Sequence, residues 1–274
     1  MGMVALHALA LIAFVVSPGA WPVWILAVVA AHTLVVALVL QPRTHLLGPN
    51  LTRLPAAAVG RREVALTFDD GPDALVTPQV LAILDGFGVK ASFFVVGSRL
   101  EAHPDVARDI VARGHSLENH TARHPLLFSF YSVAGLQREI AILQARVAQI
   151  CGGIEPRFFR PPAGFQSPML GPVLSFLGLR LATWTRRGFD TRDANARRVL
   201  LRLTRNLAAG DILLLHDGNG ARDRGGTPVV LQVLPLLLRE LRSRGLKPVT
   251  LCQAIFPPAL GAEAGVYEDH RVER

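Results

Sequence analysis

The chain has 274 residues, of which 50% are hydrophobic and 18% charged, and its mean hydropathy is +0.34. This composition excludes an intrinsically disordered chain, and the charged fraction lies below the roughly 25% of a typical soluble domain. The formal net charge is +8, but the arginines are scattered and no nucleic-acid-binding motif is found in the sequence, so we expect no nucleic-acid partner.

The N-terminal segment carries the apolar excess, because its first forty residues contain no Asp, Glu, Lys or Arg. Residues 22–40 form an uncharged apolar run about long enough to span a bilayer, and a break at residues 17–20 separates it from a shorter apolar run over 1–16. We therefore predict a transmembrane anchor over residues 1–41, as a two-helix hairpin. The alternatives are a signal peptide, which here lacks the usual positive n-region, and a buried pair of soluble helices.

Residues 42–62 are basic and irregular. They contain no acid and carry four arginines, and their prolines argue against a long helix. We expect a juxtamembrane linker that contacts acidic membrane lipid. Because positive charge favours the inner side of a membrane, we expect the domain that follows to lie on the cytoplasmic face of the cell membrane, with the extracytoplasmic face as the alternative.

From Glu63 onward, short apolar runs alternate with amphipathic segments. The helix over 77–87 is predicted to begin with an N-cap at Thr77 and to end before Gly88. Alternating β and α units predict a parallel sheet with right-handed crossovers, and about seven such units fit a small barrel better than an open sheet. We assign residues 63–255 to this domain and 256–274 to a C-terminal tail. The expected strands cover residues 63–68, 90–96, 115–119, 157–160, 179–184, 211–216 and 247–251.

Polar side chains follow these strands at their carboxyl ends, where a barrel of this kind carries its active site. Asp69 and Asp70 end the first strand, and two buried carboxylates need a partner; a solvated Asp-Gly turn is the alternative. His120 and His124 follow the third strand with a spacing that places both imidazoles on one face of a helical turn, as in other metal sites. The alternative is a surface pair of histidines.

Two more motifs follow later strands. Arg160-Pro-Pro-Ala163-Gly164 comes after the fourth strand, and Leu-Leu-His216 ends an apolar strand. Taken singly, these are also typical of a structural loop and of a core histidine.

In this order and spacing, the four motifs resemble those of the polysaccharide deacetylase family, also called the NodB-homology domain or carbohydrate esterase family 4, over about residues 61–255. The resemblance implies an α/β fold, an irregular (β/α)7 barrel, and a metal-dependent removal of acyl groups from sugars. It assigns the family's Asp-His-His metal triad to Asp70, His120 and His124. This ligand set suits Zn²⁺, with Co²⁺ or Ni²⁺ as alternatives.

The resemblance also implies the catalytic roles. Asp69 would be the general base, and Arg160 would keep it ionised. The backbone N–H of Ala163 would stabilise the oxyanion, and His216 would be the general acid that protonates the leaving amine. Asp190 is the acid retained from the family's fourth motif, so we expect it to pair with His216.

The fourth motif departs from the family pattern Trp-x-x-Asp-x-x-Asp-Trp. Arg187 replaces its first Asp, and Thr191 replaces its final Trp. Ala163 likewise replaces the Tyr often found in the third motif. These changes concern the surroundings of the hydrolytic residues, so they bear on the choice of substrate.

The sequence therefore predicts a membrane-anchored, metal-dependent hydrolase that removes an acetyl or formyl group from the nitrogen of an amino sugar. The substrate would be a glycan or a lipid-linked sugar. The alternatives are an O-acyl carbohydrate esterase and a catalytically inactive, membrane-anchored sugar-binding protein.

Overall fold

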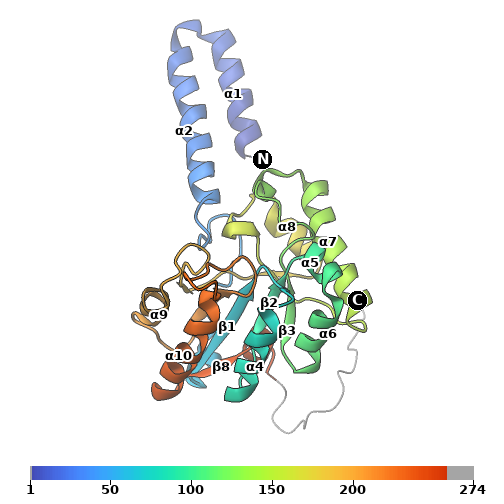
Figure 1. Cartoon of the computed structure of the whole chain (residues 1–274). Coiled ribbons are helices and arrows are strands. Elements are labelled where there is room, and N and C mark those ends of the chain that lie inside the picture. Colours follow the sequence, from blue (N-terminus) through green and yellow to red (C-terminus); the bar gives the residue numbers. More distant parts are fainter. Residues whose placement is uncertain (1, 258–274) are drawn as a thin grey trace.

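A computed structural model describes residues 2–257 as a helical hairpin that projects from an α/β domain (Figure 1). The hairpin consists of α1 (Gly2–Val16), the short 3-10 helix η1 (Pro18–Ala20) and α2 (Trp21–Val39). Helices α1 and α2 pack against each other, and most of their apolar side chains are exposed. Within the described residues, α2 is the one helix long and apolar enough to cross a membrane, and the apolar stretch of α1 is shorter.

The sheet of the domain is parallel and curled. Its strand order is β5-β4-β3-β2-β1-β7-β6, and β8 pairs with the start of β1. The edge strands β5 and β6 do not pair with each other in the described part of the chain, so the sheet forms a half-barrel. This confirms the expected α/β fold. The strands are β1 (Glu63–Asp69), β2 (Ser92–Val95), β3 (Ser116–Asn119), β4 (Phe158–Phe159), β5 (Arg180–Leu181), β6 (Arg186–Arg187), β7 (Ile212–His216) and β8 (Lys247–Val249).

Helices cover the outer face of the sheet. The helix predicted over 77–87 is present with those bounds, and it ends at Gly88, whose φ of 67° suits a glycine C-cap. The predicted N-cap is wrong: Val76 holds that position, and the Thr77 hydroxyl instead donates to Asp217. The helices are α3 (Ala56–Gly60), α4 (Thr77–Phe87), α5 (Gly97–Ala102), α6 (Pro104–Ala112), α7 (Val133–Ile150), α8 (Leu170–Phe176), α9 (Ala196–Thr204), α10 (Val229–Ser243) and α11 (Leu251–Ile255), with 3-10 helices η2 (Phe128–Phe130) and η3 (Pro162–Gly164).

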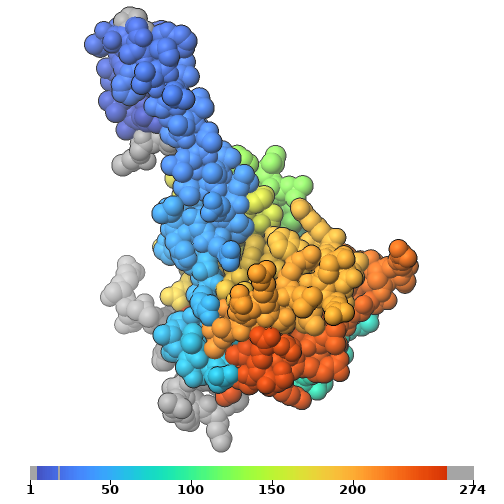
Figure 2. All heavy atoms as spheres, turned by 90° about the vertical axis from the view of Figure 1, so that its left-hand side faces the viewer, coloured from blue at the N-terminus to red at the C-terminus, as the bar shows by residue number. Residues whose placement is uncertain are grey.

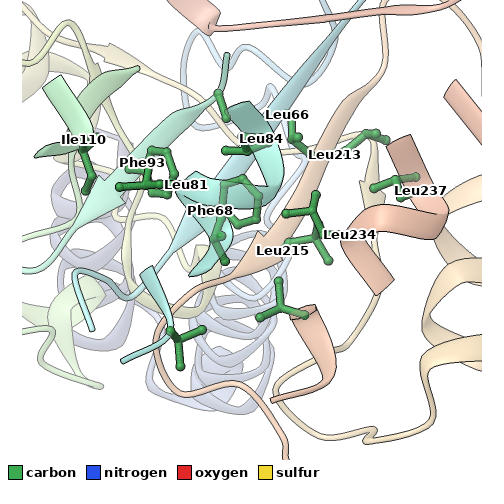
Figure 3. Close-up of a cluster of buried hydrophobic side chains, with 14 of the residues drawn as sticks. Leu66, Phe68, Leu81, Leu84, Phe93, Ile110, Leu213, Leu215, Leu234 and Leu237 are labelled. Carbon is green, nitrogen blue, oxygen red and sulfur yellow. The ribbon is translucent and has the colours of Figure 1, made fainter. Parts of the chain in front are cut away.

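Side chains along β1 point alternately to the hydrophobic core and to the candidate active site. Leu66 and Phe68 point to the helical layer, where they join a large buried cluster with α4 and α10 (Figure 3). Thr67 and Asp69 point to the opposite face, the concave interior of the half-barrel. The same alternation on β7 sends His216 to the interior, because β1 and β7 pair with Asp69 opposite His216. The strand register therefore delivers both polar side chains to one place.

The segment expected to be a linker is bound to the domain. The Leu51 N–H donates to the carbonyl of Leu181, the last residue of β5, and the Leu54 N–H donates to the Gly210 carbonyl before β7, at 2.9 and 2.8 Å. Arg53 forms an ion pair with the buried Asp211 at 3.0 Å. Figure 2 shows the light-blue atoms of residues 42–62 lying along one side of the domain. This segment thus fills the gap that the strands leave open.

Candidate metal centre and active site

Three potential metal ligands converge at the carboxyl ends of β1 and β3. Asp70 Oδ1 lies 3.3 Å from His120 Nε2 and 3.2 Å from His124 Nε2, and one ligand atom from each residue lies within 4.8 Å of the others. Ligands bound tetrahedrally to zinc at about 2.0–2.1 Å are separated by about 3.3 Å. Asp70 Oδ1 is buried and accepts no hydrogen bond from the described residues. A divalent cation fits this orphaned carboxylate oxygen, so the Asp-His-His cluster is a metal-binding site.

The second nitrogen of His120 fixes the ring for metal binding. His120 Nδ1 lies 2.7 Å from the backbone carbonyl of Arg160, which can only accept, so Nδ1 carries the proton. Nε2 is therefore free to bind a metal, as in other sites where the outer nitrogen of a ligand histidine is hydrogen-bonded. The position of His124 is fixed by a hydrogen bond that its backbone N–H donates to the Thr121 hydroxyl at 2.9 Å.

The charges of the cluster support one another. Burial by itself raises the pKa of Asp70, but the polar contact with His120 opposes burial, and this pKa is held below its ordinary range. Asp70 is thus an anion at neutral pH, as a metal ligand must be.

Asp69 is held by a fully buried arginine. Arg160 Nη1 donates to Asp69 Oδ1 at 2.5 Å and to the Thr67 hydroxyl at 3.0 Å. The other guanidinium nitrogens donate to the carbonyls of Ala182 and Thr183 at 3.0 and 2.8 Å. Because every edge of the guanidinium has a partner, its position is fixed. Asp69 Oδ2 faces the metal cluster, 3.9 Å from His120 Nε2.

His216 is paired with Asp190. Its Nδ1 lies 2.9 Å from Asp190 Oδ1, and its backbone N–H donates to Asp190 Oδ2 at 2.8 Å. Burial by itself lowers the pKa of His216, but the charge and hydrogen bond of Asp190 outweigh burial and raise it above its ordinary value. The adjacent Asp217 turns away and accepts from Thr77, and burial raises the pKa of its carboxyl to about 7.

The loop that follows Arg160 joins the site to the hairpin. Ala163 lies in η3 with a φ of 55°, and a Cβ added to Gly164 would lie 2.5 Å from Trp184 and 2.8 Å from Pro42. The backbone N–H of Gln166 donates to the Val39 carbonyl at the end of α2 at 3.3 Å. The end of the apolar helix therefore packs directly on the loop that carries Ala163.

One site residue escaped the sequence analysis. Asn219 donates from Nδ2 to Asp70 Oδ2 at 3.1 Å, and Arg99 donates to Asn219 Oδ1 at 2.6 Å. Asn219 lies three residues after His216, in a turn where its φ is 54°. Its position after a strand-end motif, in an Asp-Gly-Asn turn, is the signal that would have pointed to it.

Two cavities lie in the α/β domain. One of about 230 Å³ is bounded by residues that include His216, Asp217, Asn219 and Arg99. A larger one of about 650 Å³ lies between residues 47–55 and α8, and none of the proposed catalytic or metal-binding residues lines it. Among the proposed catalytic and metal-binding residues, His216 alone lines the smaller cavity.

Comparisons with known proteins agree with this arrangement. Residues 56–182 match the family model described as polysaccharide deacetylase. A peptidoglycan-N-acetylglucosamine deacetylase of Bacillus cereus is 31% identical over 194 residues, which cover 70% of this chain and 87% of that protein. A chitooligosaccharide deacetylase of Azorhizobium caulinodans is 34% identical over 193 residues, which cover 66% of this chain and 89% of that protein.

Solved structures agree as well. A peptidoglycan N-acetylglucosamine deacetylase superimposes with a TM-score of 0.67 at 26% identity, over 75% of this chain and 92% of that one. A family 4 carbohydrate esterase of Streptomyces lividans superimposes with a TM-score of 0.61 at 29% identity, over 68% of this chain and 91% of that one.

Proposed function

Because this chain belongs to the polysaccharide deacetylase family, we propose that it is a metal-dependent hydrolase that removes an N-acetyl or N-formyl group from an amino sugar. One observation carries the proposal: the Asp70-His120-His124 cluster, the Asp69–Arg160 pair and the His216–Asp190 pair meet at one end of the sheet. The relatives named for deacetylation of peptidoglycan or chitooligosaccharides support N-acetylglucosamine as the sugar.

The cluster would hold a divalent cation through Asp70, His120 and His124. This donor set favours Zn²⁺, and Co²⁺ or Ni²⁺ also suit it. When bound, such an ion acts as a Lewis acid toward the acyl carbonyl.

Asp69 accepts the proton of the attacking water. Arg160 directs the free Oδ2 of Asp69 toward the cluster, since the other carboxylate oxygen is held by the guanidinium. The oxygen of this water bonds to the acyl carbon as its proton moves to Asp69, which is general-base catalysis.

His216 and Ala163 complete the reaction. The backbone N–H of Ala163 donates to the acyl oxygen as negative charge develops on it. His216, protonated because Asp190 raises its pKa, gives a proton to the leaving nitrogen while the carbon–nitrogen bond breaks. The products are a carboxylate, acetate or formate, and the free amine of the sugar.

The hairpin would anchor this site at a membrane. The proposed domains are the anchor over 1–41, the segment over 42–62, the deacetylase domain over 63–255 and the tail over 256–274, of which residues 258–274 lie outside the described residues. The carboxyl ends of the strands point toward the hairpin, since β8 and the start of β1 lie at the opposite end of the domain (Figure 1). The substrate would therefore be a sugar close to the bilayer, in a glycan or on a lipid.

The arginines of residues 42–62 support the cytoplasmic face of the cell membrane for this domain, and acidic lipid as a partner.

An assay of acyl release tests the function. The full chain in detergent, loaded with zinc, is incubated with N-acetylchitotetraose, with peptidoglycan and with a lipid-linked N-acetyl amino sugar, and released acetate is measured. We expect release from at least one, and none with the Asp70→Ala variant. Release from an acetylated hydroxyl of xylan alone would identify an O-acyl esterase, and binding without release would identify an inactive sugar-binding protein.

A further inference from the structure

A guanidinium without a partner lies beside the proposed active site. Arg187 is half-buried, its Nε is buried, and its side chain forms no hydrogen bond or ion pair with any residue that the structure describes. The neighbouring Arg186 is different, because it donates to the buried Asp211 at 2.9 Å. Successive side chains of a strand point to opposite faces, so Arg186 and Arg187 lie on different sides of β6.

The strand register places Arg187 in the interior of the half-barrel. Arg187 pairs with Leu214 of β7, and Leu214 pairs with Thr67 of β1. Leu214 belongs to the interior cluster, and Thr67 contacts Arg160 there. The backbone of Arg187 therefore lies beside β7 two residues before His216. Its side chain projects to the face of the sheet that carries the catalytic groups.

Two aromatic rings hold the guanidinium in place. Its central carbon lies 5.2 Å from the centre of the Trp184 ring and 5.1 Å from that of Phe189, distances at which a cation is attracted to a ring face. Phe189 is 46% exposed, so the guanidinium lies where the interior opens to solvent. The rings position the cation, but they offer no oxygen to accept hydrogen bonds from its N–H groups.

The nearby carboxylates do not neutralise Arg187. Burial lowers its pKa, while the charges of Asp69 and Asp190 oppose this effect, and an arginine stays protonated at neutral pH. Asp69 is already paired with Arg160, and Asp190 with His216. A partly desolvated cation with free donors is costly unless a ligand supplies the anion.

We propose that Arg187 binds an oxyanion, a phosphate or a carboxylate, carried by the acylated amino sugar, and so selects anionic over neutral substrates. The planar guanidinium offers forked N–H donors that match either group. This inference rests on the proposed function, because that function supplies the acylated amino sugar as the substrate. It also gives a role to the departure from the family pattern, since a cation stands here where the fourth motif has an acid.

Matched substrates test the proposal. The zinc-loaded full chain and its Arg187→Gln and Arg187→Lys variants are assayed on three sugars: methyl N-acetylglucosaminide, which is neutral, N-acetylglucosamine 1-phosphate and N-acetylmuramic acid. The readout is the ratio of kcat/KM for each anionic sugar to that for the neutral one. Arg197→Gln, on the exposed surface of α9, removes the same charge away from the site.

We expect Arg187→Gln to lower this ratio about 10- to 100-fold for one of the two anions, the loss typical of one charge-assisted hydrogen bond. Arg187→Lys should lower it less, because it keeps the charge, and Arg197→Gln should leave it unchanged. The anion affected identifies the source as phosphate or carboxylate. An unchanged ratio with Arg187→Gln would overturn the proposal, because Arg187 would then act on all substrates alike.

Titration calorimetry with inorganic phosphate separates this proposal from the proposed function. Phosphate should bind the zinc-loaded chain about tenfold more weakly after Arg187→Gln, and equally well after Arg197→Gln. If no sugar is deacetylated while this difference is present, the proposed function fails and the anion site stands. If affinity for phosphate does not depend on Arg187, the anion site fails.

Discussion

Asp69 and Asp70 are neighbours in the sequence with different surroundings. Asp69 ends β1 and points into the half-barrel, where Arg160 holds one of its oxygens. Asp70 has a φ of 70°, which turns its carboxylate toward His120 and His124. One change of backbone direction thus gives two adjacent carboxylates two different tasks, which substitutions at each position can separate.

Asp70→Ala should remove most of the bound metal. The variant lacks the anionic ligand and keeps two histidines, which hold a divalent cation far less tightly. Elemental analysis of the purified protein measures metal per chain. Asp85→Asn, on the surface at a salt bridge with Arg113, is the control and should retain the metal. Full metal content in Asp70→Ala would show that the ligands lie elsewhere.

Asp69→Asn should nearly abolish turnover while the metal stays bound. The amide cannot accept the proton of the attacking water, and general-base catalysis contributes about 10²–10⁴-fold. The measurements are kcat on the acetylated sugar that the wild type hydrolyses, and metal content of the same sample. Wild-type kcat in this variant would refute the assignment of the base.

Asp190→Asn should move the basic limb of the pH–rate profile to lower pH. Asp190 raises the pKa of His216, so the protonated ring persists to higher pH in the wild type than it would without this carboxylate. Removing the charge lowers that pKa, and the general acid loses its proton earlier as pH rises. A basic limb that stays in place would mean that another group sets it.

At the scale of elements, the loop over residues 160–166 and the end of the apolar hairpin pack against each other. The Gln166 N–H and side-chain amide bind the Val39 and Pro42 carbonyls at 3.3 and 3.1 Å. Gly164 permits this close approach, because its φ is 80° and no Cβ separates its backbone from Pro42 and Trp184. The position of η3, and with it the Ala163 N–H, thus depends on how α2 ends.

Gly164→Ala should destabilise the domain by about 1–3 kcal/mol, because the new methyl group meets close neighbours and the backbone conformation disfavours a side chain. It should also lower kcat without loss of metal, since η3 must shift. Thermal unfolding and turnover measure the two effects. Gly86→Ala within α4 is the control: nothing lies within 4 Å of its added Cβ, so it should stabilise by about 0.5–1 kcal/mol. Equal stability of both variants would contradict the close packing at Gly164.

At the scale of the whole molecule, the half-barrel presents its site toward the hairpin (Figure 1). Residues 42–62 lie between the edge strands β5 and β6 and bond to β5 and to the residues before β7, so the hairpin, this segment and the sheet are joined by direct contacts. If the hairpin anchors the chain as proposed, a substrate close to the bilayer would reach the site without a hinge between anchor and domain.

Fusions to the C-terminus locate this domain. By the positive-inside rule, a fluorescent protein that matures in the cytoplasm should fluoresce there, and alkaline phosphatase should stay inactive. A chain with the exposed Arg43 and Arg62 both replaced by Glu is the companion variant, and its phosphatase fusion should gain activity if these charges set the orientation. Strong phosphatase activity of the unaltered chain would place the domain on the extracytoplasmic face.

Local patterns of the chain were enough to predict most elements. The alternation of apolar runs and turn residues gave β1 and β7 within a residue, and the bounds of α4, because each depends on neighbours a few residues away. The two-residue strand β6 and the short helices α3, α5 and α11 were missed. Their ends depend on partners far along the chain, such as the pairing of β6 with Leu213 and Leu214.

For the site, motif order alone indicated the family and the residues that now meet at the strand ends. Spacing could not supply what depends on packing: the support of Asp70 by Asn219, the contact of Gly164 with Pro42, and the unpaired state of Arg187. The two contacts join residues more than a hundred positions apart, and they form only once the curled sheet has brought those segments together. Residue identity therefore set the available chemistry, while the register of the sheet and the docking of the hairpin set which groups can act on one another.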